Sequence, residues 1–346
     1  MVTHMKREDV AKQMILSDCL DIMDAFCRLD NTLRPVFMLG GLGYFALIID
    51  GAIKWCSKAK IKIQFKSSDI LEKLRAKVKL FSSDSAITFE EQMRLYEEII
   101  AIEKQYFIDL QAASGKWCPR FLITDMGKYI INDHCFGNTI QFSYELNPFN
   151  PQKMPFAVAM APKGDTPPLT YTFSYELGQC MQEIIQVLSS HSYEINYEPI
   201  ALPYSKKDIR IDNHRDLKAK DGAVQIFGLC CRLNFILELL PPLCKPKSLL
   251  PFRLAYITYY HMEKDLENLQ LTKQINYHMS YRNKDFRNAM AHYSLYGKIE
   301  DSDIQEDVVG YGLFEKLLST TYGEVCENLF SEMRKTRDAL EEYIRV

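Results

Sequence analysis

The sequence predicts a mainly α-helical protein in two parts, joined by a short middle segment. Apolar residues recur at intervals of three and four over long stretches near both ends of the chain, which is the periodicity of amphipathic helices. Six prolines fall between residues 147 and 168 and separate these stretches. With 346 residues, of which 47% are hydrophobic and 25% charged, the chain is long enough for two cores. We therefore expect an N-terminal helical region over 1–138, a Pro-rich linker or small β excursion over 139–168, and a helical domain over 169–346.

The N-terminal region contains five candidate elements. Residues 9–29, 68–81 and 89–113 have the spacing of amphipathic helices, and residues 121–131 fit either a short helix or a strand. Residues 36–49 are uncharged and include three glycines, so we expect a buried helix or a turn interrupted by glycine. This stretch is shorter than the roughly 20 residues that cross a bilayer, and no membrane segment is expected.

The middle of the chain changes character. Aromatic and β-branched residues at 139–146 and 169–175 predict short strands on either side of the prolines. The proline density over 147–168 argues against any regular helix there. Residues 205–220 are polar and mildly basic, which predicts an exposed loop, with an RNA-contacting loop as the alternative.

The sequence predicts helices again in the C-terminal part. Residues 177–189 form one candidate helix, and residues 223–240 are almost continuously apolar and predict a central, buried helix. Pro251 suits a first helical turn, and that helix is expected to run to residue 266. A long last helix is expected from residue 314 to about residue 344.

Residues 287–292 read Arg-Asn-Ala-Met-Ala-His and are the most informative feature of the chain. Asn283 or Asp285 can cap the start of a helix through this segment, because either side chain accepts from a free backbone N–H. Gly297 can end the helix in the left-handed conformation. The motif is therefore expected to lie on a short, well-delimited helix.

The two sides of this motif helix differ in character. One apolar stripe is expected to bury in the core: Phe286, Ala289, Met290 and Tyr293. Asn288 and His292 are four residues apart and share the opposite face. Arg287 lies to one side, and its long stem can swing the guanidinium toward His292. Ala291 is small, so the backbone of a second subunit could approach closely.

These three polar side chains can cleave RNA without a metal ion. A neutral imidazole at His292 can take the proton of the 2′-OH, and an imidazolium can give a proton to the leaving 5′-oxygen. The guanidinium of Arg287 can stabilise the phosphate in the transition state, and Asn288 can orient the phosphate or the ring. Arg287, Asn288 and His292 are the predicted catalytic residues, with no cofactor and no metal.

The pattern Arg287-Asn288-x-x-x-His292 resembles the signature of HEPN domains, many of which are ribonucleases. The resemblance covers the last third to half of the chain. It implies a helical bundle that dimerises, with the motif of each protomer lining a shared cleft. It also implies an endoribonuclease toxin or a defence protein of the abortive-infection, antiviral type, acting on single-stranded or tRNA-like RNA and partnered by an inhibitor or activator protein. One toxin subgroup has Tyr two residues after the His, where this chain has Ser294.

Residues near the motif can assist it. Glu263 and Tyr293 are candidate supporting residues, Glu263 through a hydrogen bond to His292. Candidate RNA-binding cations surround the motif: Arg282, Lys284 and Lys298. The net charge of −3 gives no overall basic signature for nucleic acid, so any RNA-binding surface must be local.

Other patterns point away from secretion and from other chemistries. The ten cysteines are scattered without a C-x-x-C pair or zinc-ligand spacing, and charged residues interrupt any apolar run near the N-terminus. We therefore expect reduced, mostly buried thiols in a cytoplasmic protein. The pair His134-Cys135 could suggest a Cys/His nucleophile, but no third orienting group is identifiable in the sequence.

Two alternatives to the nuclease remain open. The first is a HEPN-like module that binds RNA or protein without cleavage, for which His292→Ala would leave function intact. The second is a helical scaffold with an accidental motif, for which the motif helix would face solvent in a monomer.

Overall fold

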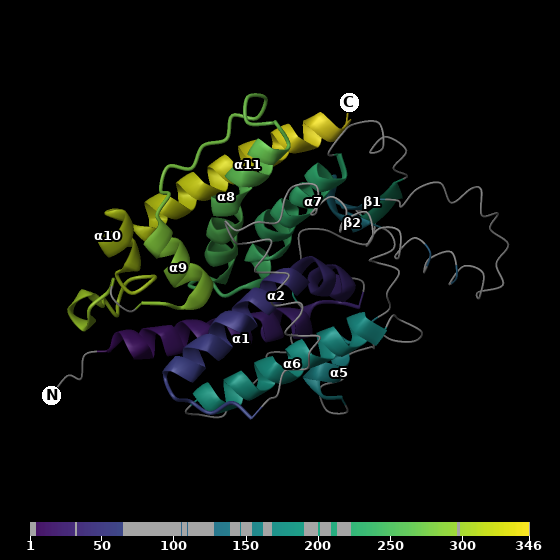
Figure 1. Cartoon of the computed structure of the whole chain (residues 1–346). Helices are drawn as coiled ribbons and strands as arrows, with labels where there is room; N and C mark the ends of the chain where they lie inside the picture. The colour runs from purple at the N-terminus through teal and green to yellow at the C-terminus, as the bar shows by residue number, and fades with distance from the viewer. Residues whose placement is uncertain are drawn as a thin grey trace.

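The computed structural model describes residues 5–31, 33–64, 128–138, 154–161, 168–189, 209–212, 223–295 and 298–345, together with residues 105, 109, 146 and 200. This part of the chain is mainly α-helical, as the sequence predicted (Figure 1). The predicted helices at 68–81 and 89–113 and the predicted strand at 139–146 lie outside the described residues, apart from those single positions.

Two long helices open the described part of the chain. Helix α1 spans Arg7–Arg28 and confirms the predicted amphipathic helix, and α2 spans Leu33–Lys58. The three glycines do not interrupt α2, because the helix is largely buried and packing stabilises it. The Arg34 side chain joins the two helices by donating to the carbonyls of Phe26 and Cys27, at 3.0 and 3.1 Å.

A small antiparallel sheet follows, in the order β2-β1-β3. Strands β1 (Lys128–Ile131) and β2 (His134–Asn138) form a hairpin whose two turn residues, Asn132 and Asp133, both have positive φ, as tight hairpin turns require. Strand β3 (Ile209–Asp212) pairs with the other edge of β1. The predicted loop at 205–220 is therefore wrong for residues 209–212, where an Ile-Arg-Ile-Asp alternation completes the sheet.

Residues 156–160 of the Pro-rich segment and its C-terminal flank are helical, contrary to expectation. Helix α5 is a short helix at Phe156–Met160, and α6 spans Pro168–Leu188. Proline is tolerated just before a helix and in its first turn, since the N–H groups there have no partner within the helix. The strand predicted at 169–175 is thus the first part of α6, and Gly178 of α6 lies directly against the backbone of Ala157.

The C-terminal helices follow the prediction, with one break. Helix α7 (Ala223–Asn234) continues into a π-helical turn, η5 (Phe235–Leu239), and a 3-10 turn, η6 (Pro241–Leu243). Helix α8 spans Leu250–Asn268 and the motif helix α9 spans Lys284–His292. After a 3-10 turn, η7 (Asp301–Asp303), the predicted last helix is divided into α10 (Leu313–Leu318) and α11 (Tyr322–Arg345). The break lies at Ser319, whose φ of 56° cannot continue a right-handed helix.

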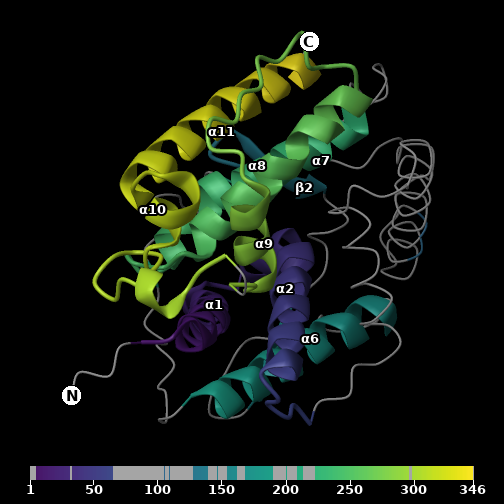
Figure 2. The ribbon, with the colours of Figure 1, turned by 60° about the vertical axis from the view of Figure 1, so that its left-hand side comes forward.

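The helices form layers around one hydrophobic core. In Figures 1 and 2, α1 and α2 lie between α6 on one side and α8 and α9 on the other, with α11 outermost beyond α8. Buried residues from α1 and α2 belong to the same cluster as those of α7, α8, α9 and α11. The expected boundary at residue 138 therefore does not divide the core.

Two apolar helical stretches in the described part, Leu33–Lys58 and Gln225–Leu243, are long enough to cross a membrane. The first has 26 residues and extends well beyond the uncharged stretch that was expected to be too short. Within the fold, 67% and 72% of the most apolar 18 residues of the two stretches are buried. Core helices of soluble proteins have the same properties, and the burial favours a core role for both stretches.

Candidate active site on helix α9

The motif helix begins at a well-formed cap. The side-chain oxygen of Asn283 accepts from the backbone N–H groups of Asp285 and Phe286, at 2.8 and 2.9 Å. Its amide nitrogen donates to the carbonyl of Leu317 at 2.9 Å, which fixes the cap against the end of α10. Of the two caps that the sequence allowed, Asn283 is therefore the one in use.

The helix ends four residues earlier than expected. Tyr293, not Gly297, takes the left-handed conformation, with φ of 52°, and its N–H donates to the carbonyl of Ala289 at 3.1 Å. A bulky residue is rare in this conformation, and tertiary contacts of the tyrosine ring hold it there. Gly297 lies outside the described residues. His292 is consequently the last residue of α9.

The two sides of α9 have the predicted characters. The apolar stripe is buried, and the exposed fraction of each of its members is 1% or less: Phe286, Ala289, Met290 and Tyr293. The Arg287, Asn288 and His292 side chains are half-buried. Helix α9 therefore presents its polar residues toward the surface of the chain while its apolar side packs into the core.

The backbone that approaches Ala291 closely belongs to α2 of the same chain, not to a second subunit as expected. Gly51 of α2 lies so close that a Cβ on it would stand 3.0 Å from the Ala291 carbonyl oxygen and 3.0 Å from the ring of Tyr293. The backbone at Ala291 thus packs closely against α2 of the same chain, and a second subunit would have to meet α9 over the half-buried polar residues instead.

Two guanidinium groups gather over one aromatic ring beside the motif. The Arg287 and Arg282 guanidinium carbons lie 5.3 and 4.4 Å from the centroid of the Tyr260 ring. Arg282 also forms an ion pair with Glu263. The sequence suggested a hydrogen bond from Glu263 to His292, but this carboxylate pairs with Arg282 instead. The Nε atom of Arg287 is buried and has no hydrogen-bond partner among the described residues. A buried donor of this kind favours an anionic ligand.

The remaining predicted cations lie around the start of α9. Lys298 forms an ion pair with Asp285 at 3.0 Å, which offsets its charge. Lys284 is exposed and is in no ion pair within the described part of the chain. The local positive charge that remains available to a phosphate therefore comes chiefly from Arg287 and Lys284.

A buried ionic network supports the end of the motif helix. The Tyr293 hydroxyl donates to Asp18 of α1 at 2.7 Å, and Arg253 of α8 forms an ion pair with the same carboxylate. Arg253 also donates through Nε to the Met290 carbonyl at 3.0 Å, and its guanidinium carbon lies 4.0 Å from the centroid of the Tyr293 ring. Burial raises the pKa of Tyr293 to about 12, so its hydroxyl stays protonated and can donate.

The sequence pointed to Tyr293 as a residue near the site, but not to Asp18 or Arg253. These residues are far apart in the chain, and no spacing rule connects them. A signal did exist, because a charged residue on the apolar side of a helix is seldom fully buried without a partner. Asp18 and Arg253 occupy such positions, each 2% exposed.

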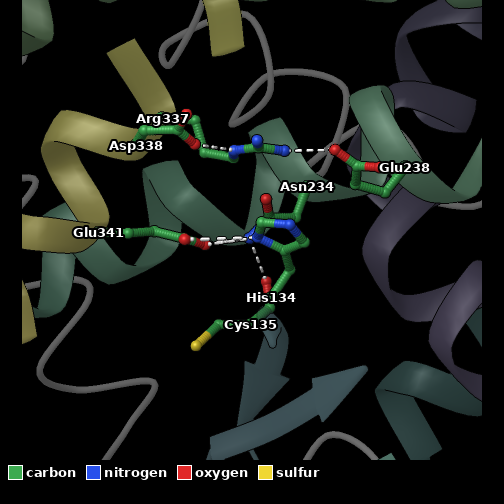
Figure 3. Close-up of polar contacts among 7 residues, drawn as sticks. All are labelled: His134, Cys135, Asn234, Glu238, Arg337, Asp338 and Glu341. Atoms are coloured by element: carbon green, nitrogen blue, oxygen red, sulfur yellow. Dashed lines mark hydrogen bonds and ion pairs between the residues drawn. The ribbon is translucent and has the colours of Figure 1, made fainter. Parts of the chain in front are cut away.

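A second polar cluster involves the adjacent residues His134 and Cys135 (Figure 3). His134 Nδ1 lies 3.3 Å from both carboxylate oxygens of Glu341, and the Asn234 amide donates to Glu341 and to the Cys135 carbonyl, each at 2.9 Å. Glu341 thus orients His134, but the Cys135 thiol points away from the imidazole and no Cys/His nucleophile forms (Figure 3). The cluster joins β2 to α7 and α11.

The charge state of Glu341 follows from this cluster. Burial would raise the pKa of its carboxyl group. Hydrogen bonds with His134 and Asn234, together with the charges of His134 and Arg337, outweigh burial and hold the pKa below the ordinary value. Arg337 itself is paired with Glu238 and with Asp338, the latter at 2.8 Å (Figure 3).

No group of three or more His, Cys, Asp or Glu side chains in the described residues is arranged to hold a metal ion. In comparisons with known proteins, no family model, curated protein or solved structure matches the chain.

Proposed function

We propose that this protein is a metal-independent endoribonuclease of HEPN type that acts on single-stranded or loop RNA in the cytoplasm. The observation that carries the proposal is the arrangement of α9. Arg287, Asn288 and His292 stay half-buried at the surface on a helix whose other side is buried. The Arg287 Nε atom, a buried donor without a hydrogen-bond partner in the described part of the chain, adds a second reason to expect a phosphate.

The reaction uses the nucleophile that RNA itself carries. His292 as a neutral base takes the proton from the 2′-OH, whose oxygen attacks the adjacent phosphorus. The bond from phosphorus to the 5′-oxygen breaks, that oxygen receives a proton, and a 2′,3′-cyclic phosphate remains. Arg287 stabilises the negative charge on the phosphate oxygens, and Asn288 positions the phosphate.

Two protonation states of histidine are needed in one turnover, a base and an acid. A homodimer with its α9 helices facing across a twofold axis would supply both, one from each protomer. The polar, half-buried face of α9 is the surface that such a dimer would share, because Gly51 of the same chain already covers the Ala291 side.

The biological role we propose is growth arrest, as a toxin or as an abortive-infection defence against phage. An RNA-cleaving dimer in the cytoplasm needs restraint, so an inhibitor or activator protein is part of this proposal. The resemblance of the motif to HEPN domains supports it.

The test is RNA cleavage in EDTA by the wild type, Arg287→Ala and His292→Ala. Matched controls are Arg334→Ala and His278→Ala, which remove an exposed arginine and an exposed histidine elsewhere on the chain. We expect a loss of about 10²–10⁴-fold for His292→Ala and about 10²–10³-fold for Arg287→Ala, with both controls near wild type. Cleavage that survives both motif substitutions would contradict the proposal.

The same proteins separate the alternatives. A non-catalytic binding module would retain RNA without cutting it, and binding would then weaken in Arg287→Ala. A scaffold with an accidental motif would neither bind nor cleave RNA, and neither motif substitution would change RNA binding or cleavage.

A further inference from the structure

We propose that Asp18, Arg253 and Tyr293 form a buried clamp that positions His292. Through Asp18, helix α1 then helps to set the geometry of the site. The inference rests on the proposed nuclease function for its catalytic consequence. Its structural content, the placement of the His292 ring, can be tested without any activity. None of the three clamp residues touches substrate, and each acts through α9.

The clamp holds the chain on both sides of His292. Two residues before it, the Met290 carbonyl accepts from Arg253 Nε at 3.0 Å. This carbonyl belongs to the last turn of α9, where no later helical N–H is available to it, and the arginine supplies the missing donor. One residue after His292, the Tyr293 hydroxyl is fixed on Asp18 at 2.7 Å.

The conformation of Tyr293 depends on these contacts. Its φ of 52° is unfavourable for a bulky residue and persists only when the surroundings over-determine it. The ring is fully buried, lies under the Arg253 guanidinium and contacts Gly51 of α2. This conformation ends the helix at His292 and so sets the direction in which the chain leaves the site.

The charge of the clamp is balanced within itself. Asp18 and Arg253 are each 2% exposed, and burial of either ion alone would be strongly unfavourable. Burial lowers the pKa of Arg253, and the interaction with Tyr293 counteracts that effect. A buried ion pair adds little net stability compared with apolar packing, so its presence here favours a role in fixing geometry.

The experiment compares Tyr293→Phe with Tyr259→Phe. The first substitution removes only the hydroxyl bound to Asp18 and keeps the ring beneath Arg253. The control removes another tyrosine hydroxyl, which is hydrogen-bonded to the Thr336 hydroxyl at 3.0 Å. Like Tyr293, Tyr259 is fully buried. Stability, kcat and KM for RNA, and the NMR signal of the His292 ring, assigned with His292→Gln, are measured for both.

We expect both variants to lose stability, Tyr293→Phe more than Tyr259→Phe because its hydroxyl bonds a buried carboxylate, while only Tyr293→Phe shifts the His292 ring signal. We also expect kcat to fall about tenfold to a hundredfold in Tyr293→Phe with KM unchanged, because small misplacements of a catalytic group are costly. Asp18→Asn reaches the same hydroxyl from its other end and should shift the same ring signal.

An unchanged His292 signal in both Tyr293→Phe and Asp18→Asn would overturn the clamp, as would equal effects of Tyr293→Phe and Tyr259→Phe on that signal. If the wild type cleaves no RNA but the signal shifts as expected, the clamp stands and the nuclease proposal fails alone.

Discussion

Single side chains set both ends of helix α9, and they do so in different ways. Asn283 caps the start through its own backbone neighbours, and sequence patterns predict such local contacts well. Tyr293 ends the helix through contacts with α1, α2 and α8. Sequence favoured Gly297, because local rules reserve the left-handed conformation for glycine, and only distant partners explain a tyrosine there.

The cap gives a direct stability prediction. Asn283→Ala removes the acceptor for two N–H groups and the donor to Leu317, so the free energy of unfolding should fall by about 1 kcal/mol, within a range of roughly 0.5–2. Chemical denaturation measures the change. Lys284→Ala, an exposed neighbour in the same helix, is the control and should change stability by less than about 0.5 kcal/mol. Equal effects would show that the cap is not used.

The Glu341 cluster predicts a pH dependence of stability. The folded state holds the pKa of this carboxyl group below its ordinary value of 4.5, so the carboxylate stabilises the fold at neutral pH. That contribution is lost as the pH falls below 4.5 and through the lower folded pKa. The difference in unfolding free energy between wild type and Glu341→Gln should therefore narrow in acid, as urea denaturation at several pH values would show.

The exposed neighbour Glu342 provides the comparison for this titration. Glu342→Gln should leave the pH profile of stability close to that of the wild type. A Glu341→Gln difference that stays constant between neutral and acidic pH would contradict the assignment of the charge.

At the scale of elements, helices were predictable where apolar periodicity extends over several turns. Helix α1 has this property, whereas α7 was expected from a nearly continuous apolar run and α8 from Pro251 in a first helical turn; all three were expected close to their observed positions. Helix α5 and strand β3 were not, because each is only a few residues long and exists through its neighbours. For α5 that neighbour is α6, and for β3 it is the edge of β1.

The packing of α2 against α9 can be tested with two glycines of the same helix. A Cβ on Gly51 would stand 3.0 Å from the Ala291 carbonyl, whereas a Cβ on Gly43 would meet nothing within 4 Å. Gly43→Ala should therefore stabilise the protein by up to about 1 kcal/mol through helix propensity. Gly51→Ala should destabilise it despite the same propensity gain, because the backbone of the motif helix must move.

Thermal denaturation of the two glycine variants gives the sign of each effect. If Gly51→Ala stabilises as much as Gly43→Ala, α2 and α9 are not in close contact. Gly51→Val, with a larger side chain, should lower stability further and also reduce RNA cleavage, since the strain falls beside His292.

At the scale of the molecule, the sequence predicted the fold class but not how its parts share a core. Composition suggested two parts, and the proline-rich segment suggested where they divide. The structure instead packs α1 and α2 between α6 and the α8–α9 layer, and Asp18 of α1 meets Arg253 of α8 in its centre. Contacts between residues so distant in the chain leave no periodic signal in the sequence.

The shared core predicts that the C-terminal part does not fold alone. A protein of residues 169–346 would lack Asp18 and the apolar surface of α1 and α2, leaving Arg253 with an unpaired charge in the core. We expect that fragment to unfold without a sharp transition and to recover when residues 1–138 are supplied in trans. A cooperative transition of the fragment alone, measured by circular dichroism, would contradict the single core.

We propose that α9 cleaves RNA through the 2′-OH without a metal. The most direct measurement is the chemistry of the ends left on RNA in EDTA, compared between wild type and His292→Ala. We expect 2′,3′-cyclic phosphate ends with the wild type, no new ends with His292→Ala, and no cleavage of DNA of the same sequence. Ends carrying a 5′-phosphate, or cyclic ends that persist in His292→Ala, would contradict it.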